Sequence, residues 1–214
     1  MVRDSINSTD ESSTHSLLRT GRAVIVDIGT GDGRFVYQNA RKNPDKFYIG
    51  IDASSAALTK LSEKIHRKPE KGGAKNALFV QASVEQLPVE FDGVADEVHI
   101  HFPWGSLLKA VISGDETILR SIRKICADDA LLEVIIGLDP VRDKTEYERL
   151  GVDALSIPRL ENELSANYAS SGFEITEYGE FPPSQWPDIC SEWARKLEVG
   201  QSRSLIYLIA SATK

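Results

Sequence analysis

The segment VIVDIGTGDG at residues 24–33 constrains the fold of this 214-residue chain more than any other stretch. Its apolar, β-branched residues predict a buried strand, and its alternating glycines predict a loop whose backbone comes close to a ligand. Residues 34–41 can form a helix, and residues 47–52 can form a second strand that ends in Asp52. A strand, a helix and a strand in this order indicate the start of a nucleotide-binding βαβ unit.

The spacing of the glycines indicates which nucleotide such a unit would bind. Dinucleotide-binding loops use G-x-G-x-x-G, and a free helix N-terminus holds the pyrophosphate. Here residues 29–33 give G-x-G-x-G, and Asp32 places a negative charge where the pyrophosphate would lie. S-adenosylmethionine, which has a ribose but no phosphate, fits better, with Asp52 accepting from both ribose hydroxyls and Asp27 facing the methionine ammonium group. The alternative is an ordinary strand-turn whose glycines serve only positive φ angles.

Composition limits the class of protein. A hydrophobic content of 41% allows a full core, and the net charge of −7 argues against a general nucleic-acid binder. Cys126 and Cys190 lack C-x-x-C spacing, so neither a disulfide framework nor a zinc site is indicated. His99 and His101 alternate on one strand face, which favours a structural role over metal binding. We therefore expect no bound metal.

The chain has no apolar run of about 18 residues and no hydrophobic signal core, which predicts a soluble, cytoplasmic protein that does not contact membranes. Residues 1–16 are polar and rich in Ser and Thr, so they are expected to form a flexible N-terminal arm. Residues 17–214 are expected to form a single domain. Linker insertions are expected within it near residues 67–76 and 138–157, outside the core.

Strand and helix patterns alternate along the rest of the chain. They predict an α/β, Rossmann-like fold with a mostly parallel seven-stranded sheet, an antiparallel edge and helices on both faces. Strands are expected at residues 24–28, 47–52, 77–81, 94–102, 130–136, 173–178 and 204–210. Helices are expected at residues 34–41, 54–65, 105–112, 116–126, 160–170 and 186–197.

A second informative segment, FPWGSLL at residues 102–108, directly follows the fourth expected strand. Ligands of open α/β sheets bind outside the carboxyl ends of the strands, so this segment is expected to border the cofactor. Pro103 and Trp104 supply a rigid turn and a wide aromatic face, which suit a flat base extruded from its stack. Trp193 is a candidate for a second aromatic face. For either tryptophan alone, packing in the core is the ordinary alternative.

Five segments together resemble a known family, the aminoglycoside-resistance 16S ribosomal RNA methyltransferases of the kanamycin and apramycin resistance type, which modify N1 of adenosine-1408. The segments are DIGTGDG (27–33), YIGID (48–52), KPEKGG (68–73), FPWGSLL (102–108) and WARKL (193–197). The resemblance extends from about Val24 to about Ala210. It implies a class I S-adenosylmethionine-dependent methyltransferase fold, with S-adenosylmethionine as cofactor and S-adenosylhomocysteine as product.

The resemblance also implies roles for individual residues. Trp104 and Trp193 are expected to stack on the flipped adenine, beside Pro103. The expected cofactor contacts are Asp27, Gly29, Thr30, Gly31, Asp52, Val84, Glu85, His101, Phe102, Pro103, Trp104, Gly105, Ser106 and Ser191. N1 of neutral adenine carries an in-plane lone pair that needs no base to expose it, so alignment with the methyl group is expected to carry the catalysis.

A local excess of basic residues is expected to contact the RNA of the 30S ribosomal subunit. Residues 60–75 contain six basic and two acidic residues, in a chain that is negative overall. The stretch includes a Gly72-Gly73 turn, expected beside the cofactor edge, which favours a phosphate-contacting loop; a solvated helix face is the alternative. The expected RNA contacts are Arg67, Lys68, Lys71, Lys75, Arg195, Lys196 and Arg203.

Two other functions remain open from the sequence. A small-molecule methyltransferase would use the same cofactor-binding half with an enclosed apolar site and no basic loop. A homologue that binds S-adenosylmethionine without modifying the ribosome is suggested by the net charge of −7 and by Gln201, where a basic residue is expected before Arg203. On the rRNA methyltransferase hypothesis, these features predict slow or incomplete modification. The chain is expected to act as a monomer.

Overall fold

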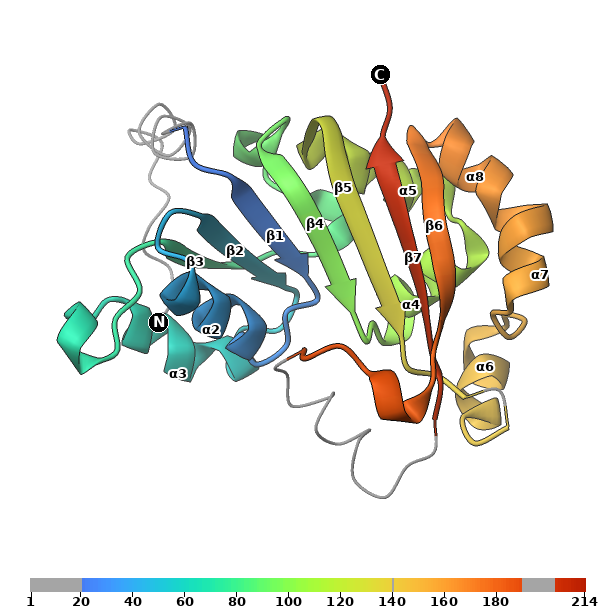
Figure 1. Ribbon diagram of the computed structural model, residues 1–214, viewed down its shortest axis with the longest axis horizontal. Coiled ribbons are helices and arrows are strands. Elements are labelled where there is room, and N and C mark those ends of the chain that lie inside the picture. The colour runs from blue at the N-terminus through green and yellow to red at the C-terminus, as the bar shows by residue number, and fades with distance from the viewer. Residues whose placement is uncertain (1–20, 140, 190–202) are drawn as a thin grey trace.

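The computed structural model describes residues 21–139, 141–189 and 203–214, and its centre is a seven-stranded sheet of order β3-β2-β1-β4-β5-β7-β6 (Figure 1). β1 to β5 run parallel, whereas β7 runs antiparallel to its neighbours β5 and β6, which confirms the expected fold class and its antiparallel edge. The strands are β1 (Val24–Ile28), β2 (Phe47–Asp52), β3 (Ala77–Gln81), β4 (Ala95–His101), β5 (Cys126–Ile136), β6 (Phe173–Phe181) and β7 (Leu205–Ala212).

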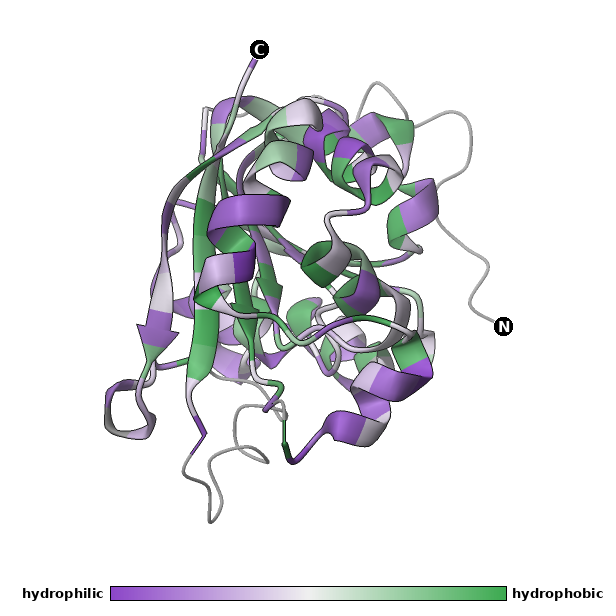
Figure 2. Ribbon diagram, turned by 90° about the vertical axis from the view of Figure 1, so that its right-hand side faces the viewer, coloured by the Kyte–Doolittle hydropathy of each residue, from purple (hydrophilic) through white to green (hydrophobic). Residues whose placement is uncertain are grey.

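Helices cover both faces of the sheet, because alternate residues of the central strands are apolar on both sides. On one face, α2 packs Val36 and Ala40 against Ile25 of β1. On the other face, Leu108 of α4 and Leu119 of α5 belong to the larger core cluster. The central strands are accordingly the most hydrophobic part of the ribbon (Figure 2). The helices are α2 (Arg34–Lys42), α3 (Ser55–Ile65), α4 (Gly105–Ser113), α5 (Glu116–Ile125), α6 (Lys144–Leu150), α7 (Ile157–Arg159) and α8 (Ser165–Ser170).

The order of the strands creates a crevice between β1 and β4. From β1 the chain continues to β2 and β3 on one side, and from β4 it continues to β5 on the other. The connections after β1 and β4 therefore diverge at the carboxyl ends of these strands, which is the usual ligand site of open α/β sheets. Residues 29–33 and 102–108, the two segments on which the functional prediction depends, follow β1 and β4 directly.

Segment 138–157 is not the linker outside the core that its charges suggested. It contains α6, and Tyr147, Leu150 and Leu155 are buried in the main core cluster. Charged side chains on the exposed side of α6 concealed this apolar side in the sequence. Segment 67–76 is a loop with a 3₁₀ turn at Pro69–Lys71.

Two other elements differ from the sequence prediction. β5 begins at Cys126, earlier than expected, because pairing with β4 continues across an irregularity at which Asp129 has a φ of 62°. The helix expected from Trp186 is absent from residues 186–189, which have no regular secondary structure. Residues 190–197, and the arm expected at 1–16, lie outside the described residues. Within the described part of the chain, no helix has both the length and the hydrophobicity that a membrane span requires.

Candidate cofactor and nucleobase site

Hydrogen bonds hold the loop after β1 against the end of β2. The amides of Gly29 and Thr30 donate to the carbonyl of Ile51 at 2.8 and 3.1 Å, and the amide of Gly31 donates to Asp52 Oδ2 at 2.8 Å. Gly29 and Gly31 have φ angles of +75° and +57°, which side chains rarely allow. A Cβ at Gly31 would meet no atom within 4 Å, so open space for a ligand lies beside the loop.

Asp52 presents its carboxylate at the tip of β2. Oδ2 accepts from Gly31, and Oδ1 accepts from the amide of Ser54 at 2.8 Å. Each carboxylate oxygen has two lone pairs, so both oxygens can accept one further hydrogen bond. Two acceptors on one rigid group match the two hydroxyls of a ribose, which fits the nucleoside part of S-adenosylmethionine.

Asp32 occupies the N-terminal end of α2, where a pyrophosphate would bind. Its Oδ1 accepts from the amide of Arg34 at 3.2 Å, and its Oδ2 pairs with the Arg34 guanidinium at 3.0 Å. A carboxylate thus already faces the electropositive end of the helix. This arrangement supports a nucleoside ligand over a dinucleotide.

A cavity of about 270 Å³ opens at the carboxyl ends of β1, β2 and β4. Nine of the expected cofactor contacts line this cofactor cavity: Gly29, Gly31, Asp52, Val84, Glu85, Phe102, Pro103, Trp104 and Ser106. Four others do not line it, although each is next in sequence to a residue that does: Asp27, Thr30, His101 and Gly105. Ser191 lies outside the described residues.

Six further residues line the cofactor cavity and were missed in the sequence: Ile28, Ile51, Ala53, Ala82, Ser83 and Leu107. Five of them are next in sequence to an expected contact, so their position beside the motifs could have identified them. Ala82 follows β3, and its amide donates to the carbonyl of Asp52 at 3.1 Å. Pairing with β2 therefore brings the end of β3 to the site.

Phe102 anchors the segment that carries Trp104. Its amide donates to the carbonyl of Ile135 at 2.8 Å, and its ring is buried with Ile135 and Leu205. Phe102 has a φ of +51°, a conformation that costs energy for a residue with a side chain and that these contacts hold in place. Trp104, two residues further on, is 47% exposed. This exposure argues against the core-packing alternative for Trp104.

The same segment lines a second cavity of about 100 Å³. Its lining residues are Phe102, Pro103, Trp104, Gly137, Leu138, Asp143 and Arg203. Arg203 pairs with Asp143 at 2.5 Å and donates to the carbonyl of Gly137 at 3.0 Å. Arg203, expected to contact RNA, therefore lies in the wall of this cavity with its guanidinium already paired. Residues 102–104 therefore line both cavities.

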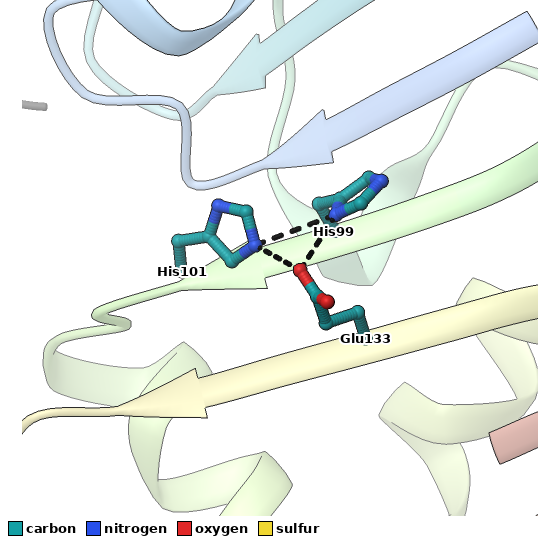
Figure 3. A group of neighbouring side chains, drawn as sticks. All are labelled: His99, His101 and Glu133. Atoms are coloured by element: carbon teal, nitrogen blue, oxygen red, sulfur yellow. Dashed lines mark hydrogen bonds and ion pairs between the residues drawn. The ribbon is translucent and has the colours of Figure 1, made fainter. Parts of the chain in front are cut away.

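A cluster of ionisable side chains lies on the α2-covered face of the sheet, near the carboxyl end of β4 (Figure 3). His99 Nδ1 and His101 Nε2 lie 3.0 and 2.7 Å from the same oxygen, Oε1 of Glu133 on β5. His99 Nε2 lies 3.2 Å from Glu97 Oε2. The ring of Phe35 on α2 packs against both imidazoles. The His101 side chain thus turns to Glu133 and does not line the cofactor cavity.

These contacts shift the pKa values of the cluster. Burial alone would lower the pKa of His99, but its contacts with Glu133 and Glu97 raise that pKa to about 9. The hydrogen bond with His99 lowers the pKa of Glu97 to about 2. Burial raises the pKa of Asp27, against the opposing effect of His101. Asp27 pairs in register with His99 across β1 and β4, so its carboxyl group belongs to the same polar region.

The expected RNA contacts of the basic stretch are all exposed: Arg67, Lys68, Lys71 and Lys75. The loop itself is fixed, because the Tyr37 hydroxyl donates to the Gly72 carbonyl at 2.9 Å. A Cβ at Gly73 would lie 1.7 Å from a backbone oxygen, so the turn requires glycine there. The expectation that this turn borders the cofactor site is wrong: the loop precedes β3, which runs parallel to β2, and therefore lies at the amino end of the sheet. Trp193, Arg195 and Lys196 lie outside the described residues.

Comparison with known proteins agrees with this geometry. A family described as NpmA, 16S rRNA (adenine(1408)-N(1))-methyltransferase, matches residues 4–212. The 16S rRNA (adenine(1408)-N(1))-methyltransferase of Escherichia coli is 35% identical over 192 residues, which cover 89% of this chain and 88% of that protein.

Solved structures give the same result. The crystal structure of the aminoglycoside resistance methyltransferase NpmB1 superposes with a TM-score of 0.83 at 41% identity, covering 95% of this chain and 93% of that one. A tryptophan-to-alanine mutant of the 16S rRNA (adenine(1408)-N(1))-methyltransferase from Catenulisporales acidiphilia, solved with its cosubstrate S-adenosylmethionine, gives 0.85 at 27% identity and covers 99% and 93% of the two chains.

The match to the family covers nearly the whole chain, including both strands that form the crevice and both segments that line the cofactor cavity. The resemblance seen in the sequence is therefore confirmed. The chain belongs to the 16S rRNA (adenine(1408)-N(1))-methyltransferases, a family of S-adenosylmethionine-dependent enzymes.

Proposed function

We propose that this enzyme transfers the methyl group of S-adenosylmethionine to N1 of adenosine-1408 in the 30S subunit, and that cells expressing it become less sensitive to aminoglycosides that contact this base. One observation carries the proposal for this chain: residues 102–104 line both the cofactor cavity and the second cavity. A direct methyl transfer requires donor and acceptor to meet at such a shared wall.

The first cavity is proposed to hold the cofactor. Asp52 accepts from the ribose hydroxyls, while the loop at residues 29–31 leaves room for the methionine part. Val84 and Glu85, which line the cavity after β3, flank the adenine part. Asp27 is buried behind this loop and acts through the electrostatics of the site.

The Phe102–Trp104 segment is proposed to hold the target base. The exposed ring of Trp104 offers one stacking face, and Trp193 is expected to offer the other. Stacking contributes roughly 1 to 3 kcal/mol per base, which offsets part of the cost of flipping the adenine out of its helix. The aromatic faces also tolerate the positive charge of the methylated product.

The chemical step needs no proton transfer. S-adenosylmethionine supplies an electrophilic methyl group. The in-plane lone pair of adenine N1 forms the new N–C bond, and the electron pair of the breaking C–S bond stays on sulfur. The enzyme's task is therefore to align N1 with the methyl group and to exclude water. This accounts for a site built from a tryptophan, a proline and backbone groups.

The basic loop at residues 67–75 is proposed to dock on ribosomal RNA, with Arg195 and Lys196, which follow Trp193 in the sequence, as further contacts. Charge–phosphate attraction acts over about 10 Å at moderate salt, so a local basic loop can bind RNA although the chain carries −7 overall. Arg203 would contact a phosphate only after its ion pair with Asp143 breaks. A ribosomal substrate supports a cytoplasmic location, and the fact that one chain supplies both cavities supports a monomer.

Primer extension on treated 30S subunits tests the proposed function. A methyl group on N1 blocks base pairing, so reverse transcriptase should stop one nucleotide before adenosine-1408, and prolonged incubation should increase the stop if modification is slow. A stop at another base would refute the target. If no stop appears but calorimetry shows normal S-adenosylmethionine binding, the chain is a homologue that only binds the cofactor. Methyl transfer to small molecules alone would favour the small-molecule methyltransferase.

Replacing Asp52 with alanine should lower the affinity for S-adenosylmethionine about 10- to 100-fold, because hydrogen bonds to a charged acceptor contribute about 1.5 to 3 kcal/mol. Isothermal titration calorimetry measures the loss. Asp92→Ala, at an exposed aspartate that does not line the cofactor cavity, is the matched control. Equal affinities of wild type and Asp52→Ala would remove Asp52 from the site.

Replacing Trp104 with alanine should lower methyl transfer to 30S subunits about 10- to 100-fold, as expected for the loss of one stacking face. S-adenosylmethionine affinity should stay within a few-fold of wild type, and Trp104→Phe should retain intermediate activity. Transfer of a radiolabelled methyl group reports the rate. Trp193→Ala is expected to behave in the same way. If both alanine variants melt far below wild type, core packing explains them instead.

The double variant Lys68→Glu/Lys71→Glu should weaken binding to 30S subunits without changing cofactor affinity. Each lost phosphate contact reduces the log–log salt dependence of binding by roughly 0.7 to 0.9. Sedimentation or filter binding at several salt concentrations measures both effects. Lys124→Glu/Lys214→Glu changes two exposed lysines away from the loop and serves as the control for net charge. A salt response equal to that of wild type would exclude the loop from docking.

A further inference from the structure

Three potential ligand atoms converge on the sheet, outside the two cavities described above (Figure 3). His99 Nδ1, His101 Nε2 and Glu133 Oε1 form a triangle with sides of 2.7, 3.0 and 3.4 Å. Two sides fit hydrogen bonds to Glu133. The third side joins two imidazole nitrogens that both face the same oxygen. None of the three residues has a role in the proposed methyl transfer.

We propose that His99, His101 and Glu133 form a binding site for one divalent transition-metal ion of the Zn²⁺ type. Two imidazoles and one carboxylate are the ligands that Zn²⁺ and its neighbours Co²⁺ and Ni²⁺ accept. Metal–ligand bonds are about 2.0 to 2.2 Å long, so ligand atoms around one ion lie about 3.0 to 3.5 Å apart. The observed triangle needs to expand by only a few tenths of an ångström to enclose an ion.

The charge around the cluster also suits a divalent cation. The carboxyl groups of Asp27, Glu97 and Glu133 surround the two imidazoles. Lys46 brings one positive charge and pairs with Glu97 at 3.1 Å. Acidic side chains thus outnumber Lys46 around the two imidazoles, which suits a divalent cation.

The surroundings of His99 match those of a metal-bound histidine. Histidine ligands usually direct their second ring nitrogen to a carboxylate or carbonyl, and His99 Nε2 lies 3.2 Å from Glu97 Oε2. His101 Nδ1 is buried without a hydrogen-bond partner in the described part of the chain, so no contact there fixes the tautomer. The side chains of Glu133 and Glu97 are 28% and 32% exposed, which gives an ion access and leaves its remaining positions to water.

The position of this site gives the ion a structural role. It would tie β4 to β5 at His101, one residue before the strained Phe102. An ion that binds the folded chain and not the unfolded one stabilises the fold by mass action. The inference concerns metal binding alone and does not depend on the proposed substrate.

Metal titration of the full-length protein tests the site. Protein freed of metal with EDTA is titrated with Zn²⁺ in competition with a chromophoric chelator, and we expect one tightly bound equivalent per chain and a higher melting temperature. Co²⁺ should bind at the same stoichiometry and give visible absorption bands typical of nitrogen and oxygen ligands. Less than one equivalent of bound Zn²⁺ would overturn the proposal.

Variants locate the ion. His99→Gln, His101→Gln and Glu133→Gln should each lower Zn²⁺ affinity at least tenfold, whereas His66→Gln, which removes an exposed imidazole outside the cluster, should leave it unchanged. Thermal melts establish that each variant is folded. If a histidine variant does not fold, Glu133→Gln still tests the site, because it keeps the size of the side chain. Wild-type affinity in the folded cluster variants, or loss of the ion in His66→Gln, would contradict the assignment.

Discussion

The hydrogen bond from the Gly31 amide to Asp52 joins the loop after β1 to the end of β2, and the rest of the cofactor site depends on it. β1 ends at Ile28, which pairs with Ile51, so the loop leaves the sheet beside Asp52, the next and last residue of β2. A glycine-rich loop beyond a strand would otherwise leave its amides without partners. Here β2 supplies them, and the carboxylate proposed to bind the ribose also orders the loop beside it. Cofactor affinity and loop geometry are therefore coupled through one side chain.

The second half of the site has a different origin. Its wall is the segment after β4, held in a strained conformation by the Phe102 amide and ring, and its far side comes from Gly137, Asp143 and Arg203. The Arg203–Asp143 ion pair joins the start of β7 to the N-terminus of α6. The cofactor half is thus built from a local motif, whereas the proposed base-binding half requires the antiparallel edge of the sheet to be in place.

This difference explains how far the sequence could predict the structure. β1, β2 and β3 were predicted at their observed bounds, because short apolar runs between glycines and charges determine them locally. The partners of Arg203 and of His99 could not be predicted, because Asp143 and Glu133 are 60 and 34 residues away along the chain. Alternation placed His99 and His101 on one face, but only the β4–β5 pairing brings Glu133 to them. Residues 138–157 were misjudged because exposed charges outnumber the buried Tyr147, Leu150 and Leu155.

The fixed turn at Gly72-Gly73 has a consequence for how the enzyme meets a ribosome. A flexible basic loop would lose conformational entropy when phosphates ordered it, and that loss would subtract from the attraction. The Tyr37 contact and the tight turn at Gly73 have already ordered this backbone within the folded chain. The backbone positions of its basic residues are therefore set before any RNA arrives, so in the proposed docking only their exposed side chains would lose freedom on binding phosphates.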